Sequence, residues 1–309
     1  MRISVIIPHR NDFDNLKVCL ESLAGQQSEA SAVEILVVDN GSAISPESIC
    51  SSVPGVRLVI EPEPGPGPAR NRGIAEAKGD ILAFTDSDCR VDRGWLAAIL
   101  DAFRDPEVSV AGGDIIVKYA DPSAPTLIEP YERVYSFRNR SYIRKGFSAA
   151  ANLAVRRTVF DRVGGFGGRG IAEDQDWGLR ASATGFKPVY LPAMVVFHPA
   201  RPSLQALLEK WNRHIAHDYN ALPAGAGARL RWSLRALLIL FSPPAEIPRL
   251  LSSAQLRGPR TRALAIIVLF RIRAFRAWRM LGLLARARSK DMFQWNEPKS
   301  GHQGRISRT

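Results

Sequence analysis

Short apolar runs, each ended by polar residues, most constrain the fold of this 309-residue chain. Four of them span residues 3–7, 33–38, 56–60 and 81–84, with helix-like or polar stretches between them. Runs of this length without alternation are typical of strands that are buried on both faces. The order strand, helix, strand, loop, strand predicts parallel pairing, and therefore an α/β sheet flanked by helices.

Two carboxylates, Asp86 and Asp88, follow the run at 81–84 with one residue between them. Side chains two apart in an extended segment point the same way. Open α/β sheets bind ligands in the crevice beyond the carboxyl ends of their strands. Two carboxylates there repel each other unless a cation lies between them or one takes up a proton. Since carboxylate and phosphate oxygens suit Mg²⁺ or Mn²⁺, the pattern favours a metal–diphosphate site, with a solvated acidic turn as the alternative.

Polar loops also follow the runs at 3–7 and 33–38, as Pro8-His9-Arg10-Asn11 and Asp39-Asn40-Gly41-Ser42. These loops can face the same crevice as the paired carboxylates, and a nucleotide fits such a place. An Asp can accept a hydrogen bond from the imide of a base, and an Asn can bind ribose. Arg70 or Arg72 can meet a diphosphate with a fork of donors.

Four segments, in this order, resemble the family-two inverting nucleotide-sugar glycosyltransferases, which have the GT-A fold. They are Ile-Ile-Pro near the N-terminus, Val-Val-Asp-Asn-Gly-Ser, Pro-Ala-Arg-Asn-Arg-Gly-Ile and Phe-Thr-Asp-Ser-Asp. The resemblance covers about residues 1–200. It implies a Rossmann-like mixed sheet flanked by helices, with the donor site in the N-terminal half.

The resemblance also implies roles at the donor site. Asp39 would hold the base, Asp86 would face the ribose or the donor sugar, and Asp88 would hold the metal under the diphosphate. His198 would complete the metal shell as neutral imidazole, although a hydrogen-bonded histidine without a metal is the alternative. The other nucleotide-sugar contacts implied are Pro8, Arg10, Asn11, Ser42, Arg70, Asn71 and Asn152. Pro8 and Asn11 could equally be residues that end a strand.

At the acceptor side, the resemblance makes Asp174 the base that takes the acceptor hydroxyl proton, with Glu173 or Asp176 as the fallback. These carboxylates also have a structural explanation, because a helix N-terminus favours negative charge. Trp177 would stack on an acceptor sugar, or it would pack in the core. The implied reaction is one displacement with inversion at the anomeric carbon.

The net charge of +12 is concentrated in the C-terminal third. Residues 203–309 hold 19 Lys+Arg and 5 Asp+Glu, or +14, so residues 1–202 carry −2. Such a basic segment indicates an anionic partner. Between residues 229 and 290, arginines alternate with apolar runs of at most 8 residues; a bilayer span needs roughly 20. We therefore expect helices that lie in an anionic membrane interface, with packing on the catalytic domain or on another subunit as the alternative.

Three parts follow from this asymmetry: a GT-A catalytic domain at 1–202, a basic helical appendage at 203–295 and a disordered tail at 296–309. Cys19, Cys50 and Cys89 form no disulfide framework, which fits a reducing compartment. The N-terminal apolar run is too short for a signal sequence. The expected location is cytoplasmic, peripheral at the inner face of the plasma membrane.

The predicted function is metal-dependent transfer from a nucleoside-diphosphate sugar to a hydroxyl acceptor, with a lipid-linked or envelope glycan favoured. Two other classes stay open. A nucleotidyltransferase would need a Gly-rich, Lys-containing phosphate loop after the first strand, where this chain has Pro8-His9-Arg10-Asn11. A nucleic-acid binder would carry its basic residues in polar arms and not among apolar runs, so no nucleic-acid partner is expected.

Overall fold

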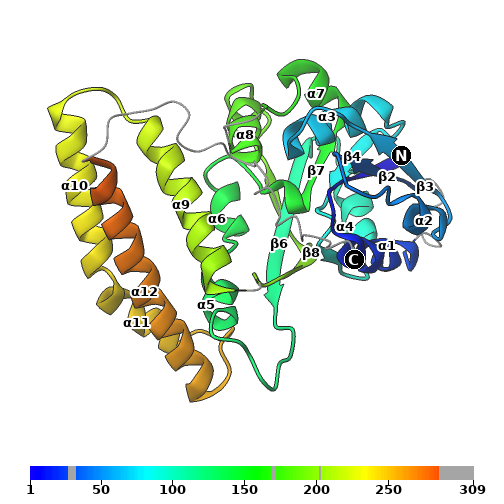
Figure 1. Cartoon of the computed structure of the whole chain (residues 1–309). Coiled ribbons are helices and arrows are strands. Elements are labelled where there is room, and N and C mark those ends of the chain that lie inside the picture. Colours follow the sequence, from blue (N-terminus) through cyan, green and yellow to red (C-terminus); the bar gives the residue numbers. More distant parts are fainter. Residues whose placement is uncertain (27–32, 169–171, 202, 285–309) are drawn as a thin grey trace, which may run out of the picture.

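The computed structural model describes residues 1–26, 33–168, 172–201 and 203–284. At its centre lies one eight-stranded sheet with the strand order β3-β2-β1-β4-β7-β6-β8-β5 (Figure 1). In chain order the strands are β1 Ile3–His9, β2 Val33–Asp39, β3 Val56–Ile60, β4 Ile81–Phe84, β5 Arg90–Val91, β6 Val110–Lys118, β7 Leu153–Arg156 and β8 Val189–Pro199. β1 is parallel to β2 and β4, and β2 is parallel to β3, which confirms the parallel order predicted for the first four runs.

The sheet is mixed because β7 runs antiparallel to both β4 and β6. The apolar pattern does not predict β5, which has two residues, or β7, which has only three apolar residues before Arg156. β8 is one continuous strand although its sequence holds two apolar runs, at 189–191 and 194–197. Its register to β6 shifts, so that Leu191 lies opposite Gly113 but Val195 lies opposite Asp114. The irregularity falls at Pro192 and Ala193, which interrupt the apolar run and so mimic a break between two strands.

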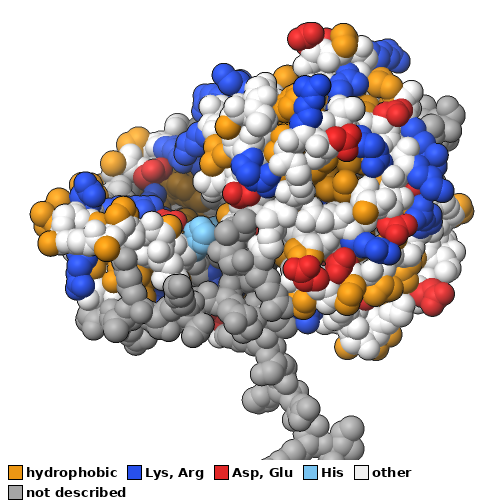
Figure 2. Space-filling model, turned by 90° about the horizontal axis from the view of Figure 1, so that it is seen from above, with side chains coloured by type: hydrophobic (Ala, Val, Ile, Leu, Met, Phe, Trp, Pro, Cys, Tyr) orange, Lys and Arg blue, Asp and Glu red, His pale blue; other side chains and the backbone are white. Residues whose placement is uncertain are grey.

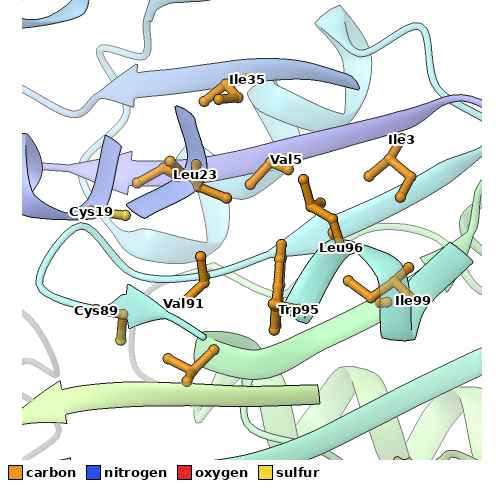
Figure 3. Close-up of a cluster of buried hydrophobic side chains, with 14 of the residues drawn as sticks. Ile3, Val5, Cys19, Leu23, Ile35, Cys89, Val91, Trp95, Leu96 and Ile99 are labelled. Carbon is orange, nitrogen blue, oxygen red and sulfur yellow. The ribbon is translucent and has the colours of Figure 1, made fainter. Parts of the chain in front are cut away.

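Helices cover both faces of the sheet. In chain order they are α1 Phe13–Ala24, α2 Glu47–Ser51, α3 Pro66–Glu76, α4 Trp95–Ala102, α5 Glu129–Tyr135, α6 Asn139–Ile143, η1 Ala150–Asn152 (a 3₁₀ turn), α7 Arg157–Val163, α8 Glu173–Ala183, α9 Leu204–Asn220, α10 Ala226–Phe241, α11 Pro243–Leu251 and α12 Gly258–Leu284. On one face α1, α2 and α4 bury Val5 and Trp95 (Figure 3). On the other face α3, α7 and α8 bury Ile6, because neighbouring residues of a strand point to opposite faces.

The C-terminal helices α9 to α12 form a second packed body beside the sheet (Figure 1). Tyr131 and Val134 of α5 share a buried cluster with Leu207 of α9 and Val268 of α12, which joins this body to the sheet part. The C-terminal helices therefore pack on the part of the chain that contains the sheet, which is the alternative stated above to a membrane interface. The tail predicted at 296–309 lies outside the described residues. Within the described ranges, none of the helices has the combination of length and hydrophobicity that a membrane crossing requires.

Candidate active site

A cleft of about 610 Å³ opens beyond the carboxyl ends of β1, β2 and β4. Parallel strands place their carboxyl ends at one edge of a sheet, so the polar loops after these strands meet there. The cleft is lined by Pro8, His9, Arg10, Asp12, Asn40, Gly65, Pro66, Ala69, Arg70, Asp86, Ser87, Asp88, Glu173 and Arg213. Five residues predicted at the donor site and one predicted at the acceptor side therefore share one cavity.

Arg70 of α3 joins the two sides of this cleft. Its side chain is 5% exposed, and it donates from Nη2 to Asp86 Oδ1 at 2.7 Å and from Nη1 to Glu173 Oε1 at 2.9 Å. Burial alone would lower the pKa of Arg70, but the charges of Asp86 and Glu173 outweigh it and raise that pKa. Among the described residues, the buried Nε of Arg70 has no partner. Arg70 thus holds the carboxylate after β4 against the start of α8.

Replacing Arg70 by lysine is expected to lower the free energy of unfolding by about 3 kcal/mol, the typical cost of breaking a buried ion pair. A single ammonium cannot span two carboxylates as the guanidinium fork does, so Asp86 or Glu173 loses its partner. Chemical denaturation measures the change. The matched control is Arg72→Lys, because Arg72 is 46% exposed in its pair with Glu76 and should change stability by about 0.5 kcal/mol at most. Equal stability of the Arg70 variant and the control would rule out this bridging role.

Asp88 and His198 form a pair suited to a divalent cation. His198 Nε2 lies 3.3 Å from Asp88 Oδ2, and its Nδ1 lies 2.5 Å from the carbonyl oxygen of Pro199. That carbonyl can only accept, so Nδ1 carries a proton and Nε2 is the nitrogen that faces the Asp88 carboxylate. When Nε2 carries no proton, two acceptors lie opposite each other. Two acceptors that face each other are stabilised by a proton or a metal cation between them. Carboxylate, imidazole and phosphate oxygens together suit Mn²⁺ or Mg²⁺.

Cys89 belongs to the same group, since ligand atoms of Asp88, Cys89 and His198 all lie within 4.8 Å of one another. Burial is the main cause that raises the pKa of the Cys89 thiol well above its ordinary value, and the charge of Asp88 adds to it. The thiol therefore stays protonated and lies 3.6 Å from Asp88 Oδ1 as a donor. Burial also raises the pKa of Asp88. A hard cation at this place would thus use Asp88 and His198, and not the sulfur.

The three carboxylates at the start of α8 are in different environments. Glu173 is bonded to Arg70, and Asp176 is paired with Arg180 Nε at 2.9 Å. Asp174 has no ion-pair partner among the described residues and accepts from the backbone N–H of Gln175 at 2.8 Å. Burial, and then the negative charge of Glu173, raise the pKa of Asp174 to about 6. A carboxylate that titrates near neutral pH is suited to general-base catalysis, so Asp174 is the best placed of the three.

Asn11, Asp39 and Ser42 connect the loops after β1 and β2. Ser42 donates from its backbone N–H to Asp39 Oδ2 at 3.3 Å and accepts from the backbone N–H of Asn11 at 2.9 Å. Asp39 Oδ1 lies 3.3 Å from His9 Nδ1. Asn11 has a φ of 53°, a left-handed conformation that asparagine adopts more readily than most residues. These bonds fix the loops that carry Pro8 and Arg10, whereas contact of Asp39 with a base stays a prediction.

Trp177 and Asn71 support neighbouring parts of the fold and make no contact with the cleft. Trp177 is 1% exposed, stacks on Phe160 with ring centroids 4.6 Å apart, and donates from Nε1 to the carbonyl of Gly164 at 2.9 Å. Its predicted stacking on an acceptor sugar is wrong, because neither ring face is free; the alternative of core packing is confirmed. Asn71 exchanges two hydrogen bonds, at 2.9 and 2.8 Å, with the backbone of Phe166. The amide of Asn71 thereby positions the loop after α7.

Asn152 is fully buried, which contradicts its predicted place beside the donor sugar. Its Nδ2 donates to the carbonyls of Asp114 and Met194, both at 2.9 Å, and its Oδ1 accepts from Trp95 Nε1 at 2.8 Å. Both amide hydrogens are therefore used within the protein. Asn152 ties β6 and β8 to α4 and leaves no donor for a sugar hydroxyl.

Arg213 of α9 lines the cleft although no sequence motif indicates it. The only signal in the sequence is its place on a basic segment that also carries Lys210. The C-terminal helices thus contribute a positive charge to the same cleft as Asp86 and Asp88.

Comparisons with known proteins agree with this arrangement. The model of "Glycosyl transferase family 2" matches residues 4–168, which is more than half of the chain. The chain is 33% identical over 207 residues to the glycosyltransferase AglE of Haloferax volcanii, covering 65% of this chain and 67% of that protein. It is 30% identical over 217 residues to a pre-mycofactocin glycosyltransferase of Mycobacterium tuberculosis, covering 66% of this chain but only 44% of that protein.

Two solved structures share the fold at low sequence identity. The mannosyltransferase PcManGT of Pyrobaculum calidifontis, in complex with GDP-Man and Mn²⁺, gives a TM-score of 0.59 at 20% identity and covers 92% of this chain and 86% of its own. S. aureus TarS, residues 1–349 in complex with UDP-GlcNAc, gives a TM-score of 0.52 at 19% identity, over 91% of this chain and 89% of its own. The chain therefore belongs to glycosyl transferase family 2 and is a glycosyltransferase with the GT-A fold.

Proposed function

We propose that the protein transfers a sugar from a nucleoside-diphosphate sugar to a hydroxyl acceptor in one displacement with inversion. The observation that carries this proposal is the single cleft that gathers Asp86, Asp88, Arg70 and Glu173, with Asp174 directly after Glu173. Structural neighbours with the same fold were solved with GDP-Man and Mn²⁺ and with UDP-GlcNAc, which supports a nucleotide-sugar donor.

Asp88 and His198 would hold Mn²⁺ or Mg²⁺ in this proposal. A bound divalent cation neutralises the diphosphate and makes it a better leaving group. Arg10 and Arg213, which line the same cleft, add positive charge on the diphosphate side. Pro8 and Asn40 line the cleft where the nucleotide would bind, and Asp39 directly precedes Asn40.

Asp174 would take the proton of the acceptor hydroxyl as that oxygen attacks the anomeric carbon. The base must be ionised to do so, and a carboxylate with a pKa of about 6 is mostly ionised at neutral pH while still basic enough to accept a proton. The fork of Arg70 fixes the start of α8 relative to Asp86, so the base and the donor diphosphate keep one relative orientation.

The test is to incubate the purified full chain with a panel of nucleotide sugars and Mn²⁺ or Mg²⁺, and to measure nucleoside diphosphate. A thermal-shift screen against nucleoside diphosphates with metal selects the base before the sugars are tried. Release of nucleoside diphosphate that stops on addition of EDTA is the expected result. Release of pyrophosphate would instead indicate nucleotidyl transfer and would reject the proposal.

The exposed face of the C-terminal helices supports a membrane partner. Leu238 and Phe241 of α10 are each 73% exposed, and Trp278 of α12 is 69% exposed. Figure 2 shows hydrophobic and basic side chains interspersed on the lobe at the left, which these helices form. Apolar side chains with arginines around them are typical of helices that lie in an anionic membrane interface. We infer that this face rests on the membrane that would carry a lipid-linked or envelope glycan acceptor.

The double variant Leu238→Glu/Phe241→Glu is expected to bind vesicles of phosphatidylcholine with phosphatidylglycerol at least about tenfold more weakly than the wild type. Each of these side chains gains about 1.5 kcal/mol or more when it leaves water, and a tenfold change in affinity needs about 1.4 kcal/mol. Co-sedimentation with vesicles measures the change. Ile44→Glu/Ile60→Glu is the matched control, because these side chains are 70% and 55% exposed on the sheet part. Equal losses in both double variants would show that added charge alone weakens binding, and would remove this face as the docking surface.

A further inference from the structure

A second cavity, of about 350 Å³, lies between β6, α5, α6 and α11, outside the cleft described above. It is lined by Asp114, Ile115, Ile116, Arg133, Val134, Phe137, Arg138, Asn139, Arg140, Ser141, Arg144, Arg249 and Gln255. Five guanidinium groups therefore surround one carboxylate. Figure 1 shows α5 and α6 beside β6, on the side of the sheet that faces the C-terminal helices.

Three of these arginines, Arg138, Arg140 and Arg144, are exposed and have no ion-pair partner anywhere in the described part of the chain. The guanidinium of Arg140 lies over the ring of Tyr190, 5.1 Å from its centroid. The hydroxyl of Tyr190 donates to Asp114 Oδ2 at 2.8 Å, so the one carboxylate of the cavity is already bonded. Five guanidinium groups with one carboxylate among them leave a net positive charge, and an anion between them would relieve the repulsion.

The other two arginines are fixed in place. Arg133 donates from Nη1 to the carbonyl of Val117 at 2.8 Å, and its buried Nε has no partner among the described residues. Arg249 lies 3.4 Å from Glu246 and stacks over the ring of Tyr135, 5.3 Å from its centroid. Buried or anchored guanidinium groups lose little further freedom when they bind a ligand. A fork of fixed donors is the arrangement that recognises phosphate.

The cavity borders residues that contact the metal pair and residues of the C-terminal helices. Phe137 lines it, and the ring of Phe137 packs against that of His198 with centroids 4.8 Å apart. His198 in turn is the partner of Asp88. Arg249 of α11 and Gln255 after it also line the cavity, and α11 packs against α10 and α12. An anion in this cavity would therefore sit one aromatic ring away from the metal pair.

We propose that this arginine cavity is a binding site for a phosphate or diphosphate group, and that it holds this group of the acceptor while the glycan end reaches the cleft. The second half of the proposal rests on the glycosyl transfer proposed above, whereas phosphate binding by the cavity does not. The group can come from a membrane lipid or from a soluble phosphate compound. Both present the same oxygens to the arginines.

The test titrates inorganic pyrophosphate into the full chain by calorimetry, with EDTA present so that no metal bridges the ligand. The double variant Arg140→Gln/Arg144→Gln is expected to bind pyrophosphate at least tenfold more weakly, roughly, than the wild type, because each charge-assisted bond contributes about 1.5 kcal/mol or more. Binding of pyrophosphate in the reaction cleft affects the wild type and the variant alike, so the difference between their titrations reports on the arginine cavity. The matched control, Arg93→Gln/Arg104→Gln, removes two exposed arginines outside both cavities and should stay within about twofold of the wild type.

A second arm compares vesicles of phosphatidylcholine with and without phosphatidic acid, whose headgroup is a phosphate monoester. If Arg140→Gln/Arg144→Gln loses binding to both pyrophosphate and phosphatidic acid vesicles, the ligand is a lipid phosphate. If it loses binding to pyrophosphate alone, the ligand is a soluble phosphate compound. Unchanged pyrophosphate affinity, or an equal loss in the control, overturns the site. Nucleoside diphosphate release by the wild type is measured separately. If the wild type is active but Arg140→Gln/Arg144→Gln binds pyrophosphate normally, only this inference is rejected. If the arginine cavity binds pyrophosphate but the wild type is inactive, only the proposed function is rejected.

Discussion

Changing Asp88 to asparagine is expected to lower nucleoside diphosphate release by roughly 10³-fold while the protein stays folded. The loss corresponds to about 4 kcal/mol of transition-state stabilisation, within the range that a cation on a leaving group supplies. Asparagine keeps the shape of the side chain but removes the negative charge that would hold the cation with His198. Because burial raises the pKa of Asp88, its charge is unfavourable in the metal-free fold, and its removal should not destabilise the protein.

The measurement is the release rate as a function of Mn²⁺ concentration in Asp88→Asn and in a nearby control, Asp92→Asn. Asp92 follows β5 and does not line the cleft, so its variant should stay within about twofold of the wild type. If Asp88→Asn kept the rate and the metal response of the wild type, the metal would have to lie elsewhere.

Replacing Asp174 by asparagine is expected to lower turnover by about 10²- to 10⁴-fold, the usual contribution of a general base. The same change should raise stability at pH 8 by about 3 kcal/mol. The pKa of Asp174 in the fold, about 6, exceeds the ordinary value of 3.8. Ionisation is therefore harder in the folded state, and the penalty grows as pH rises from 3.8 to 6. Denaturation should show the gain at pH 8 and no gain at pH 4, where Asp174 is already protonated.

The same pKa predicts the pH dependence of the wild type. Turnover should rise through pH 6, as Asp174 loses its proton, and level off above that range. Glu173→Gln removes a neighbouring negative charge that helps to raise this pKa, so the acidic limb of the rate profile should move to lower pH. If the acidic limb of the rate profile did not move in Glu173→Gln, the base would be another group. The same would follow if Asp174→Asn gained as much stability at pH 4 as at pH 8.

The parallel half of the sheet could be predicted because its information is local. β1, β2 and β4 are apolar runs that end in polar residues, and burial on both faces requires such runs wherever they lie in the chain. The strand ends then place Asp86 and Asp88 at the ligand edge without further knowledge. β5 has two residues and β7 has three apolar residues before Arg156, against four in β4, so neither gives a comparable signal.

The contacts that decide side-chain roles could not be predicted, because they join distant parts of the chain. Arg70 and Glu173 are 103 residues apart, and their bond depends on how α8 packs on α3. Trp177 and Asn152 are polar or aromatic residues near the site whose sequence pattern is the same whether they face a ligand or the core. Arg213 reaches the cleft only because α9 folds back over it.

The affinity for a nucleoside diphosphate, measured by calorimetry with Mn²⁺ and with EDTA, tests the metal-dependent donor site most directly. In the wild type, binding should be at least about tenfold tighter with Mn²⁺, since Asp88 and His198 would hold the cation and the cation would neutralise the diphosphate. In Asp88→Asn the two affinities should be nearly equal. Equal affinities in the wild type, or a full metal effect in Asp88→Asn, would contradict a cation-bridged donor in this cleft.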